Sequence, residues 1–318
     1  MSDKRSTEHE RIRLLAEFFA APSCFELSIG DDCAVLPPQA SPLALSVDAS
    51  VEDVHFRRAW MSLEDIGFRA TMAALSDLAA MGAKPTGILS SLILPREFTD
   101  AELLALMQGQ RQAATAADAP VVGGNLARGD VLSITTTVMG LSERPVQRAG
   151  AKPGDQLFIA GALGLARTGL HLLQTGQTPT SDLARWNNAR AAFVRPTARL
   201  HEGLLANARG AHAMIDLSDG LCADAHHLAT ASQVLLVLDE ELLRHSFLPL
   251  LPAQLEAPME AILCGGEDYA LLVAAPANTM PEQFIVVGSV ESAAHPAVVL
   301  SGSEGRRQLS PKGFDHFG

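Results

Sequence analysis

Apolar residues recur along this chain with two different periods, and each period predicts one kind of secondary structure. Residues 7–20 carry apolar side chains at helical spacing, for example Ile12 and Leu15, with charged residues opposite. Residues 43–48 alternate between apolar and polar instead, which predicts a strand that ends at Asp48. The same patterns predict further helices at 62–81, 99–117 and 165–174, strands at 88–94, 131–140, 156–160, 213–217, 269–274 and 284–290, and loops at 120–130 and 176–190.

The order of these elements and the length of the chain predict two domains of α/β type. Helix and strand patterns alternate in both halves, and 318 residues correspond to two domains of ordinary size. Between the halves, residues 148–155 are rich in turn residues and poor in core residues. We therefore expect one domain over residues 1–148 and a second over residues 149–318.

The composition narrows the classes of function. Hydrophobic residues make up 47% of the chain, which is enough for a sizeable core, and the aromatic share of 5% argues against a surface that stacks on bases or sugars. The formal net charge of −12 opposes binding to nucleic acid and to anionic membranes. An acidic protein that binds ATP needs cations between itself and the phosphates, so the charge also suggests a divalent metal.

Cysteine usage and the first residues indicate a cytoplasmic protein. Cys24, Cys33, Cys222 and Cys264 are far apart and form no C-x-x-C pair, so neither a disulfide framework nor a zinc site is expected. Residues 1–13 are too charged for a signal peptide, and the chain has no run of about 18 apolar residues that could cross a membrane.

Asp77 is the first candidate metal ligand. Its neighbours three and four residues away on the predicted helix are all apolar, with Ala73 and Ala80 among them. An unpaired carboxylate on such a face is costly, and a bound cation would stabilise it. The alternative is a buried aspartate that accepts a hydrogen bond from a neighbouring backbone amide.

Carboxylates also occur in a loop and at a predicted strand end. Asp31 and Asp32 follow a glycine, and adjacent carboxylates suit a hard cation, although Gly-Asp is also ordinary turn chemistry. Asp48 ends the strand predicted at 43–48, where the sheet would fix a carboxylate beside a loop that admits ligand. The alternative for Asp48 is a polar residue that merely terminates the strand.

The second half contains two more acidic segments. Residues 215–220, Ile-Asp-Leu-Ser-Asp-Gly, place two acids and a hydroxyl between a strand and a helix. Ser218 or Asp219 could cap that helix, but a cap needs only one such residue. Residues 265–268, Gly-Gly-Glu-Asp, and residues 123–125, Gly-Gly-Asn, combine polar side chains with glycines that allow close backbone approach.

The phosphate-binding signals of common nucleotide enzymes are weak or missing. Gly161-x-x-Gly164 precedes a predicted helix and could hold phosphate on its amides, but a tight strand-to-helix turn explains it equally well. The sequence has no G-x-x-x-x-G-K-[S/T] loop and no protein-kinase motif set. Several acid-bearing segments with few Lys or Arg residues near them fit an anion that is held through metal ions.

In their order along the chain and in their residues, these segments resemble the thiamine-monophosphate kinase family. That family belongs to the superfamily that includes aminoimidazole ribonucleotide synthetase. The resemblance runs nearly from end to end of the chain. It rests on residues 29–34 (Ile-Gly-Asp-Asp-Cys-Ala), 46–48 (Ser-Val-Asp) with His55-Phe56, 75–83 (Leu-Ser-Asp-Leu-Ala-Ala-Met-Gly-Ala), 123–125, 148–155 (Arg-Ala-Gly-Ala-Lys-Pro-Gly-Asp), 215–220, 265–269 (Gly-Gly-Glu-Asp-Tyr) and 312–317 (Lys-Gly-Phe-Asp-His-Phe).

The resemblance implies an activity, a fold and a set of site residues. It implies transfer of the γ-phosphate of ATP to thiamine monophosphate with several Mg²⁺ ions, in a homodimer whose N-terminal sheets join into a barrel. The implied magnesium positions are Asp32, Ser46, Val47 through its backbone oxygen, Asp48, Asp77, Asn125, Asp216 and Asp219. The implied ATP positions are Gly124, Asn125, Arg148 and Ser218, and the implied substrate positions are His55, Glu267 and Phe314.

One departure from the family pattern concerns the metal. The family phrase is usually Gly-Gly-Asp, and this chain has Asn125 in place of the aspartate. An amide oxygen can still bind Mg²⁺, but more weakly than a carboxylate. We expect Asn125 to remain a ligand, with Asp130 as a less favoured substitute.

The implied reaction needs little general acid or general base catalysis. The nucleophile is a phosphate oxygen that is already ionised at neutral pH, so we expect direct in-line transfer without a phosphoenzyme.

Two alternative functions remain. One is a superfamily member that activates an amide or carbonyl oxygen with ATP, against which His55-Phe56 argues. The other is a catalytically reduced member that binds nucleotide or thiamine phosphates, to which Asn125 points.

Overall fold

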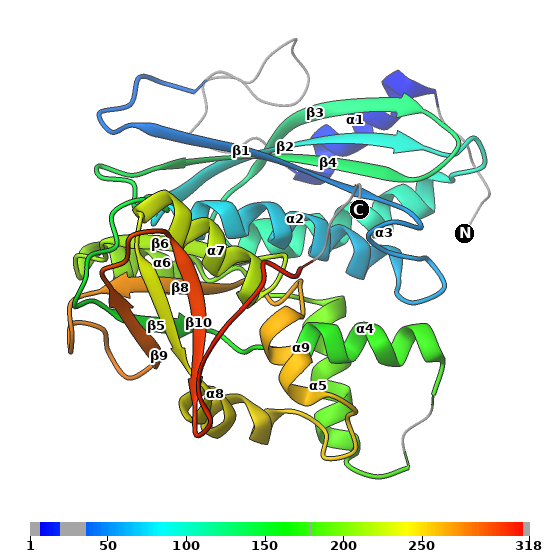
Figure 1. Cartoon of the computed structure of the whole chain (residues 1–318). Helices are drawn as coiled ribbons and strands as arrows, with labels where there is room; N and C mark the ends of the chain where they lie inside the picture. The colour runs from blue at the N-terminus through cyan, green and yellow to red at the C-terminus, as the bar shows by residue number, and fades with distance from the viewer. Residues whose placement is uncertain (1–6, 20–35, 178–179, 314–318) are drawn as a thin grey trace. The chain divides into compact units, whose positions relative to one another are not determined.

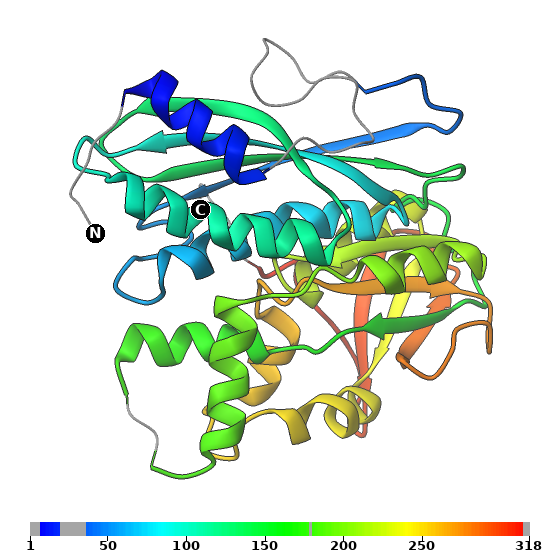
Figure 2. The ribbon, with the colours of Figure 1, turned by 180° about the vertical axis from the view of Figure 1, so that it is seen from behind.

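The computed structural model describes residues 7–19, 36–177 and 180–313, and the chain divides into two compact units (Figures 1 and 2). The first unit comprises Met1–Leu78 and Lys84–Glu143, and the second comprises Ala79–Ala83 and Arg144–Gly318. Each unit contains one sheet with helices, which confirms the predicted α/β class. Within the described ranges, none of the helices combines the length and the apolar character that a membrane-spanning segment needs.

The first unit is an open sheet with helices packed on one face. Its described elements are α1 (Glu8–Phe19), β1 (Leu43–Val51), α2 (Leu63–Ala80, of which the last two residues belong to the second unit), β2 (Lys84–Leu94), α3 (Asp100–Ala116), β3 (Val121–Arg128) and β4 (Ser133–Leu141). These strands pair in the order β1-β4-β2-β3, with β2 and β3 parallel and the other neighbours antiparallel. Figure 1 shows α2 and α3 along the same side of this sheet.

Alternation along the strands decides which face of this sheet is buried. Ile134, Thr136 and Val138 of β4 are buried, and the residues between them are only half-buried. A Cβ placed on Gly140, two positions beyond Val138, would lie 3.1 Å from Cδ1 of Leu78, so α2 covers the buried face. The opposite face carries exposed apolar side chains on the edge strand β1.

Four predictions about element bounds are wrong. The strand predicted at 88–94 begins at Lys84, because β4 offers partners as far as Leu141. The strand predicted at 43–48 continues to Val51, because β4 offers partners as far as Ser133, and Asp48 therefore lies inside β1. The loop predicted at 120–130 is mostly the strand β3. A Cβ at Gly124 would lie 1.8 Å from the carbonyl oxygen of Ser90, so the glycine that suggested a loop is required by strand pairing.

The fourth wrong prediction is the loop at 176–190. From Leu183 onward this segment is the helix α5 (Leu183–Val194). Its polar residues face solvent, and Trp186, Ala189 and Phe193 are buried at helical spacing. The predicted loop therefore ends at Asp182.

The second unit is a larger mixed sheet. Its further described elements are β5 (Gln156–Ala160), α4 (Leu165–Thr175), α6 (Leu200–Ala208), β6 (Ala213–Leu217), α7 (Leu221–Ser232), β7 (Leu235–Asp239), α8 (Glu240–Phe247), the 3-10 turn η1 (Leu248–Leu250), α9 (Pro258–Cys264), β8 (Ala270–Ala275), β9 (Phe284–Glu291), β10 (Ala297–Gly302) and β11 (Gly305–Gln308). The described strands pair in the order β11-β10-β7-β9-β5-β8-β6. Only β7 and β10 run parallel among these described pairs.

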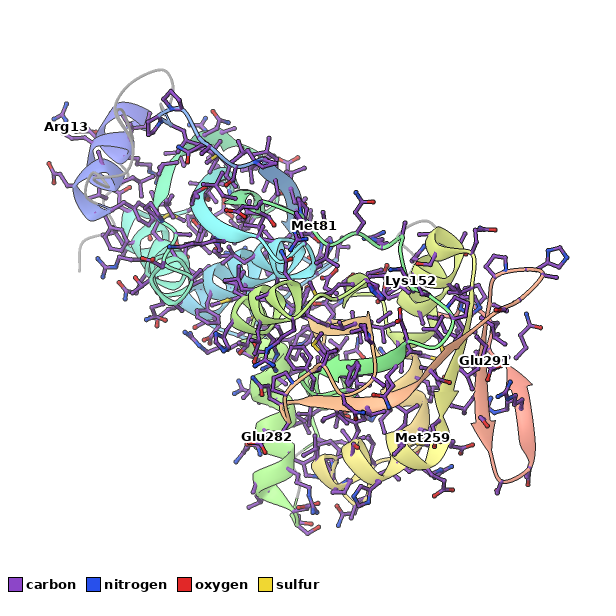
Figure 3. The ribbon with its side chains drawn as sticks, turned by 90° about the vertical axis from the view of Figure 1, so that its left-hand side faces the viewer. Arg13, Met81, Lys152, Met259, Glu282 and Glu291 are labelled. Carbon is purple, nitrogen blue, oxygen red and sulfur yellow. The ribbon has the colours of Figure 1, made fainter. Side chains whose placement is uncertain are left out.

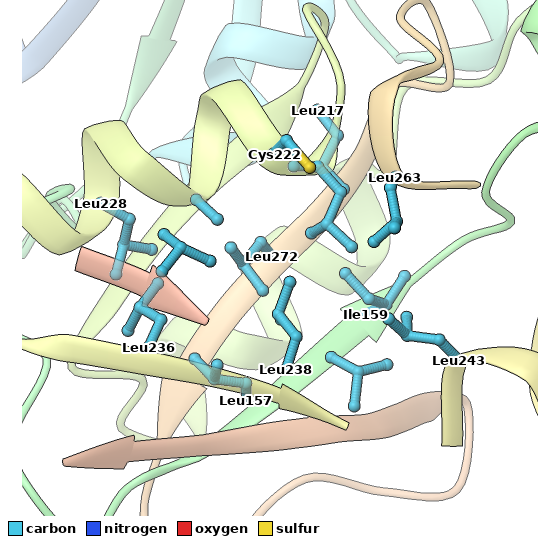
Figure 4. Packing of buried hydrophobic residues seen from close by; sticks show 14 of the residues in the cluster. Leu157, Ile159, Leu217, Cys222, Leu228, Leu236, Leu238, Leu243, Leu263 and Leu272 are labelled. Carbon is cyan, nitrogen blue, oxygen red and sulfur yellow. The ribbon is translucent and has the colours of Figure 1, made fainter. Parts of the chain in front are cut away.

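Both faces of this sheet are covered. Leu157 and Ile159 of β5 point into a core shared with α7, α8 and α9, part of which is shown in Figure 4. Phe158 and Ala160 point to the other face, where they pack with residues of α6 and with Ala79 of α2. Figure 3 labels Met259 near the start of α9, the helix that leads into residues 265–268.

Candidate active site

Asp77 and Ser46 meet in the first unit. The Ser46 hydroxyl donates a hydrogen bond of 2.5 Å to Oδ2 of Asp77, and both residues are half-buried. Asp77 lies on α2 among buried alanines, as its apolar neighbours predicted. The helix and strand β1 thus hold two oxygen-bearing side chains in contact, although they are separated by 31 positions in the sequence.

Asp48 faces the same side of the sheet as Ser46. Its register partner on β4 is Thr136, and the partner of Thr136 on β2 is Ser90, so the three residues form a row across the sheet. The hydroxyls of Thr136 and Ser90 are buried and make no hydrogen bond within the described part of the chain. The row from Asp48 is therefore polar inside an otherwise apolar layer, which is uncommon without a ligand or ordered water.

His55 lies just beyond the end of β1. Its Nδ1 accepts a hydrogen bond of 3.1 Å from the backbone N–H of Val51. Acceptance at Nδ1 places the proton of the neutral ring on Nε2, so the short turn after β1 fixes both the orientation and the tautomer of this imidazole.

Gly124 and Asn125 lie on β3 opposite Ser90 and Ser91 of β2. Asn125 is exposed, so its amide can reach a ligand without leaving the strand. Gly124 continues the row of Asp48, Thr136 and Ser90, because Ser90 is its register partner. Only Gly124 therefore extends the row, whereas Asn125 is paired with Ser91, whose side chain lies on the other face of β2 from that of Ser90.

The second unit gathers acidic side chains around the turn between β6 and α7. Asp216 is buried near the end of β6, and Ser218 and Asp219 follow it half-buried. Asp224, in the first turn of α7, is buried, and its Oδ2 accepts hydrogen bonds of 3.1 Å from the N–H groups of both Asp219 and Gly220. Burial, and then the charges of Asp216 and Asp219, raise the pKa of Asp224 to about 8.

Residues 265–269 cross over this turn. The N–H of Glu267 donates to the carbonyl oxygen of Ser218 at 2.7 Å, and the N–H of Tyr269 donates to that of Leu217 at 2.9 Å. The Tyr269 hydroxyl donates to Oε2 of Glu267 at 2.9 Å. Two segments that lie about fifty positions apart in the sequence are therefore one structural element of the site.

Asp268 occupies the helix start that had been a candidate phosphate site. Its Oδ2 accepts from the N–H of Gly164 at 2.6 Å, and its Oδ1 accepts from that of Ala166 at 3.0 Å. Burial raises the pKa of Asp268 to about 7, although these two hydrogen bonds act in the opposite direction. Because the Asp268 carboxylate already accepts from them, the N–H groups of Gly164 and Ala166 are not open to phosphate in this structure.

Several implied site residues are not placed beside these groups. Asp31, Asp32 and Phe314 lie outside the described residues. Arg148 is exposed, and its carbonyl oxygen accepts a hydrogen bond of 2.9 Å from Ser232. Among the residues that the structure describes, no three His, Cys, Asp or Glu side chains are arranged so that they alone could hold a metal ion.

Comparison with known proteins establishes the family. The family described as AIR synthase related protein, N-terminal domain, matches residues 30–142. The thiamine-monophosphate kinase of Aquifex aeolicus (strain VF5) is 34% identical over 295 residues, which cover 91% of this chain and 92% of that protein. The chain belongs to the thiamine-monophosphate kinase family. The resemblance predicted from the sequence segments is thereby confirmed.

Solved structures from the thiamine-monophosphate kinase family have the same fold. The kinase from Stenotrophomonas maltophilia K279a is 30% identical, with a TM-score of 0.78 over 92% of this chain and 95% of that chain. AaThiL complexed with AMPPCP and TMP is also 30% identical, with a TM-score of 0.79 over 99% of this chain and 100% of that chain. The predicted aminoimidazole ribonucleotide synthetase-like fold is therefore confirmed.

Three further residues of this region in the thiamine-monophosphate kinase family member, Asp224, Asp268 and Tyr269, have no role assigned from the sequence patterns. Asp224 and Tyr269 each lie a few positions from an implied site residue, and their spacing was available in the sequence. In the sequence, Asp268 is only the second acid of its segment. Its partners Gly164 and Ala166 lie 104 and 102 positions earlier, and local pattern reasoning gave no signal for that contact.

Cys222 and Cys264 are neighbours in this member of the thiamine-monophosphate kinase family, although they are far apart in the sequence. Both are free thiols, their Sγ atoms lie 3.8 Å apart, and they share a hydrogen bond. That hydrogen bond lowers the pKa of the Cys264 thiol to about 7. The same bond, together with burial, raises the pKa of Cys222.

We expect Cys264 to react with iodoacetamide with a half-maximal rate near pH 7, below the value of about 8.5 for an ordinary thiol. The thiolate is the nucleophile, so the rate should rise through the pKa of Cys264. The substitution Cys222→Ala removes the hydrogen bond and should move the midpoint upward. Peptide mapping by mass spectrometry across pH values follows Cys264 separately from the other cysteines, and an unchanged midpoint in Cys222→Ala would contradict the coupling.

Proposed function

We propose that this chain catalyses the ATP-dependent phosphorylation of thiamine monophosphate to thiamine diphosphate, with Mg²⁺ and by direct in-line transfer. The main support is the likeness to AaThiL complexed with AMPPCP and TMP, which extends over 99% of this chain. AMPPCP is an analogue of ATP, so that structure holds the two ligand classes that the proposal requires. The proposed location is the cytoplasm.

Magnesium fits the chemistry of the side chains present. The proposed ligands, Asp32, Ser46, Asp48, Asp77, Asn125, Asp216 and Asp219 with the backbone oxygen of Val47, offer oxygen atoms throughout, and hard cations prefer oxygen. Burial, and after it the charges of Asp216 and Asp219, raise the pKa of Asp224, and a cation near this turn would offset the repulsion among these carboxylates. When bound, Mg²⁺ supplies charge neutralisation between the phosphates of the two substrates.

No described group needs to act as a general base in this proposal. The acceptor oxygen belongs to a phosphate and is ionised at neutral pH, so the work of the protein is alignment of two polyanions. We assign residues 1–148 to binding of ATP and metal and to dimerisation, with Gly124 and Asn125 near the nucleotide. Arg148 and Ser218 complete the proposed ATP contacts, while His55, Glu267 and Phe314 contact thiamine monophosphate.

A coupled assay of ADP release tests the proposed activity. We expect Mg²⁺-dependent ADP release with thiamine monophosphate, and no comparable release with aminoimidazole ribonucleotide precursors or with thiamine. Binding of AMPPCP without any turnover of ATP would instead favour a reduced member of the family. The in-line step has its own test, because ATP made chiral at the γ-phosphorus should give inverted product, and retention would require a phosphoenzyme.

The proposed homodimer is supported by exposed apolar side chains on one face of the first sheet. Leu43, Leu45 and Val47 are 41%, 63% and 63% exposed, and all lie on one face of the edge strand β1. Ile93 of β2 is on the same face by register and is 40% exposed. A row of large apolar side chains on an edge strand is an unusual surface for a monomer.

We expect Leu45→Asp combined with Val47→Asp to convert a dimer into a monomer. Both charges would be buried unpaired in an interface formed by this face, which costs several kcal/mol. Size-exclusion chromatography with light scattering reports the mass. Leu183→Asp is the matched control, because Leu183 is 55% exposed on α5 and lies in the other unit. A double variant that keeps the wild-type mass would rule out this face as the interface.

A further inference from the structure

The segment Gly265–Tyr269 has an unfavourable backbone. Glu267 has φ of +72° and Tyr269 has φ of +48°, and neither residue is a glycine. A left-handed conformation costs of the order of 1–3 kcal/mol for such residues and persists only where the surroundings enforce it. Because two residues in this conformation flank Asp268, contacts with other segments of the chain must hold the backbone of residues 265–269 in place.

Hydrogen bonds to two other segments of the chain enforce that shape. The N–H groups of Glu267 and Tyr269 are held by the carbonyl oxygens of Ser218 and Leu217. Both carboxylate oxygens of Asp268 are held by the N–H groups of Gly164 and Ala166. The helix α4 has no cap from its own N-cap residue, so Asp268 supplies its cap from a distant part of the chain.

The geometry separates the side chains of this segment. The side chain of Asp268 reaches α4, whereas those of Glu267 and Tyr269 contact each other through the hydrogen bond from the Tyr269 hydroxyl to Oε2 of Glu267. With one carboxylate oxygen held by Tyr269 and its backbone held by Ser218, Glu267 has little freedom to choose another orientation. A preorganised carboxylate of this kind binds a ligand without first losing side-chain entropy.

We propose that Asp268 and Tyr269 are positioning residues that hold Glu267 in the orientation that binds the acceptor substrate. This rests on the proposed function, in which Glu267 contacts thiamine monophosphate. Asp268 acts through the backbone, by fixing the strained segment to the N-terminus of α4. Tyr269 acts through the side chain, by holding one oxygen of the Glu267 carboxylate.

The isosteric substitution Asp268→Asn tests the first part. Both oxygens of Asp268 accept hydrogen bonds, and the amide nitrogen of asparagine cannot accept one, so one of the two contacts must be lost. We expect the KM for thiamine monophosphate to rise by about tenfold, while the KM for ATP and the Mg²⁺ requirement stay unchanged. Isothermal calorimetry with thiamine monophosphate should show the same loss without turnover.

A matched control separates positioning from general loss of stability. Asp239 caps α8 in the same unit by accepting from the N–H of Leu242 at 3.0 Å. The substitution Asp239→Ala removes a helix cap as well, and we expect it to lower thermal stability without changing either KM. If Asp239→Ala raises the KM for thiamine monophosphate as much as Asp268→Asn does, the proposal is overturned.

Tyr269→Phe keeps the proposal testable if Asp268→Asn does not fold. It removes only the hydroxyl and leaves the backbone contacts intact, and we expect a rise of about threefold in the KM for thiamine monophosphate. In a Glu267→Gln background, neither Tyr269→Phe nor Asp268→Asn should raise the KM further, because both act through Glu267. Fully additive effects, or a wild-type KM in both single variants, would overturn the inference.

The same measurements distinguish failure of the proposed function from failure of this inference. A wild-type chain that neither binds nor phosphorylates thiamine monophosphate contradicts the proposed function and, with it, the inference that rests on it. A wild-type chain that is active, with an unchanged KM in Asp268→Asn, Tyr269→Phe and Glu267→Gln, leaves the proposed function intact and contradicts only the positioning role.

Discussion

Asp77→Asn should lower turnover of thiamine monophosphate by about a hundredfold or more without lowering the thermal stability of the protein. The side chain keeps its shape, so the neighbouring buried alanines of α2 stay packed. What changes is the negative charge at the point where Ser46 donates its hydrogen bond of 2.5 Å. If Asp77 helps to hold Mg²⁺, a neutral amide should also raise the Mg²⁺ concentration required for half-maximal rate.

The helix itself offers a matched control for Asp77. Asp65, in the first turn of α2, also accepts a hydrogen bond from a serine hydroxyl, at 2.8 Å from Ser62. Asp65→Asn therefore makes the same chemical change in a similar Ser–Asp pair on the same helix, and we expect turnover close to that of the wild type. Coupled measurement of ADP release over a range of Mg²⁺ concentrations compares the two variants. Near-normal turnover and Mg²⁺ dependence in Asp77→Asn would remove the metal role of this carboxylate.

The sequence was sufficient to predict features that depend on local pattern. The helix α3 begins where Thr99 and Glu102 form a capping box, and its predicted start at residue 99 was close to the observed Asp100. The strand β6 has the predicted bounds, because every residue from Ala213 to Leu217 is buried and the run is short. In both cases, the signal lies within a few residues of the element it defines.

The features that could not be predicted depend on partners far away in the sequence. Asp48 was expected at a strand end, but β4 continues to pair with β1 for three residues beyond it. Gly124 was expected in a loop, but the close approach of Ser90 makes glycine a requirement of the strand. Asp268 caps a helix 104 residues earlier. Nothing in the segments around these residues specifies the partner.

The contact of Cys222 with Cys264 illustrates the same limit for the candidate site. Their spacing of 42 positions matches no metal or redox motif, so the sequence indicated no relation between them. In the structure, they flank the two segments that meet at Ser218 and Glu267. Folding thus brings together Cys222 and Cys264, which lie next to the identified motifs but are not part of them.

Gly109→Ala should destabilise the first unit strongly, although it places the best helix former in the middle of a helix. Alanine favours a helix interior over glycine by about 1 kcal/mol. At this position, however, the new Cβ would lie 1.8 Å from the carbonyl oxygen of Glu64 in α2. On the other side of the crossing, a Cβ at Gly67 would lie 2.0 Å from the carbonyl oxygen of Leu106, so neither backbone can yield without separating the helices.

The free energy lost when α2 and α3 separate should exceed the free energy gained from the higher helix propensity of alanine. Overpacking against backbone costs typically 1–3 kcal/mol and occasionally more, and here buried contacts of Ile66 and Leu103 would also loosen. We expect a net loss of about 3 kcal/mol, which corresponds to a fall of about 10 °C in Tm for a unit of this size. The hydrogen bond of 2.8 Å from Gln112 to Glu64 across the crossing should be lost as well.

Thermal unfolding of Gly109→Ala, followed by circular dichroism in the absence of ligands, checks this expectation. Gly176→Ala is the control, because a Cβ at Gly176 meets no atom within 4 Å and only its φ of +63° opposes the change. That control should cost about 1 kcal/mol. Since α2 also carries Asp77, the shift of this helix in Gly109→Ala should reduce turnover even at temperatures where the variant is folded. A Tm equal to or above that of the wild type would show that the two helices tolerate a methyl group at their crossing.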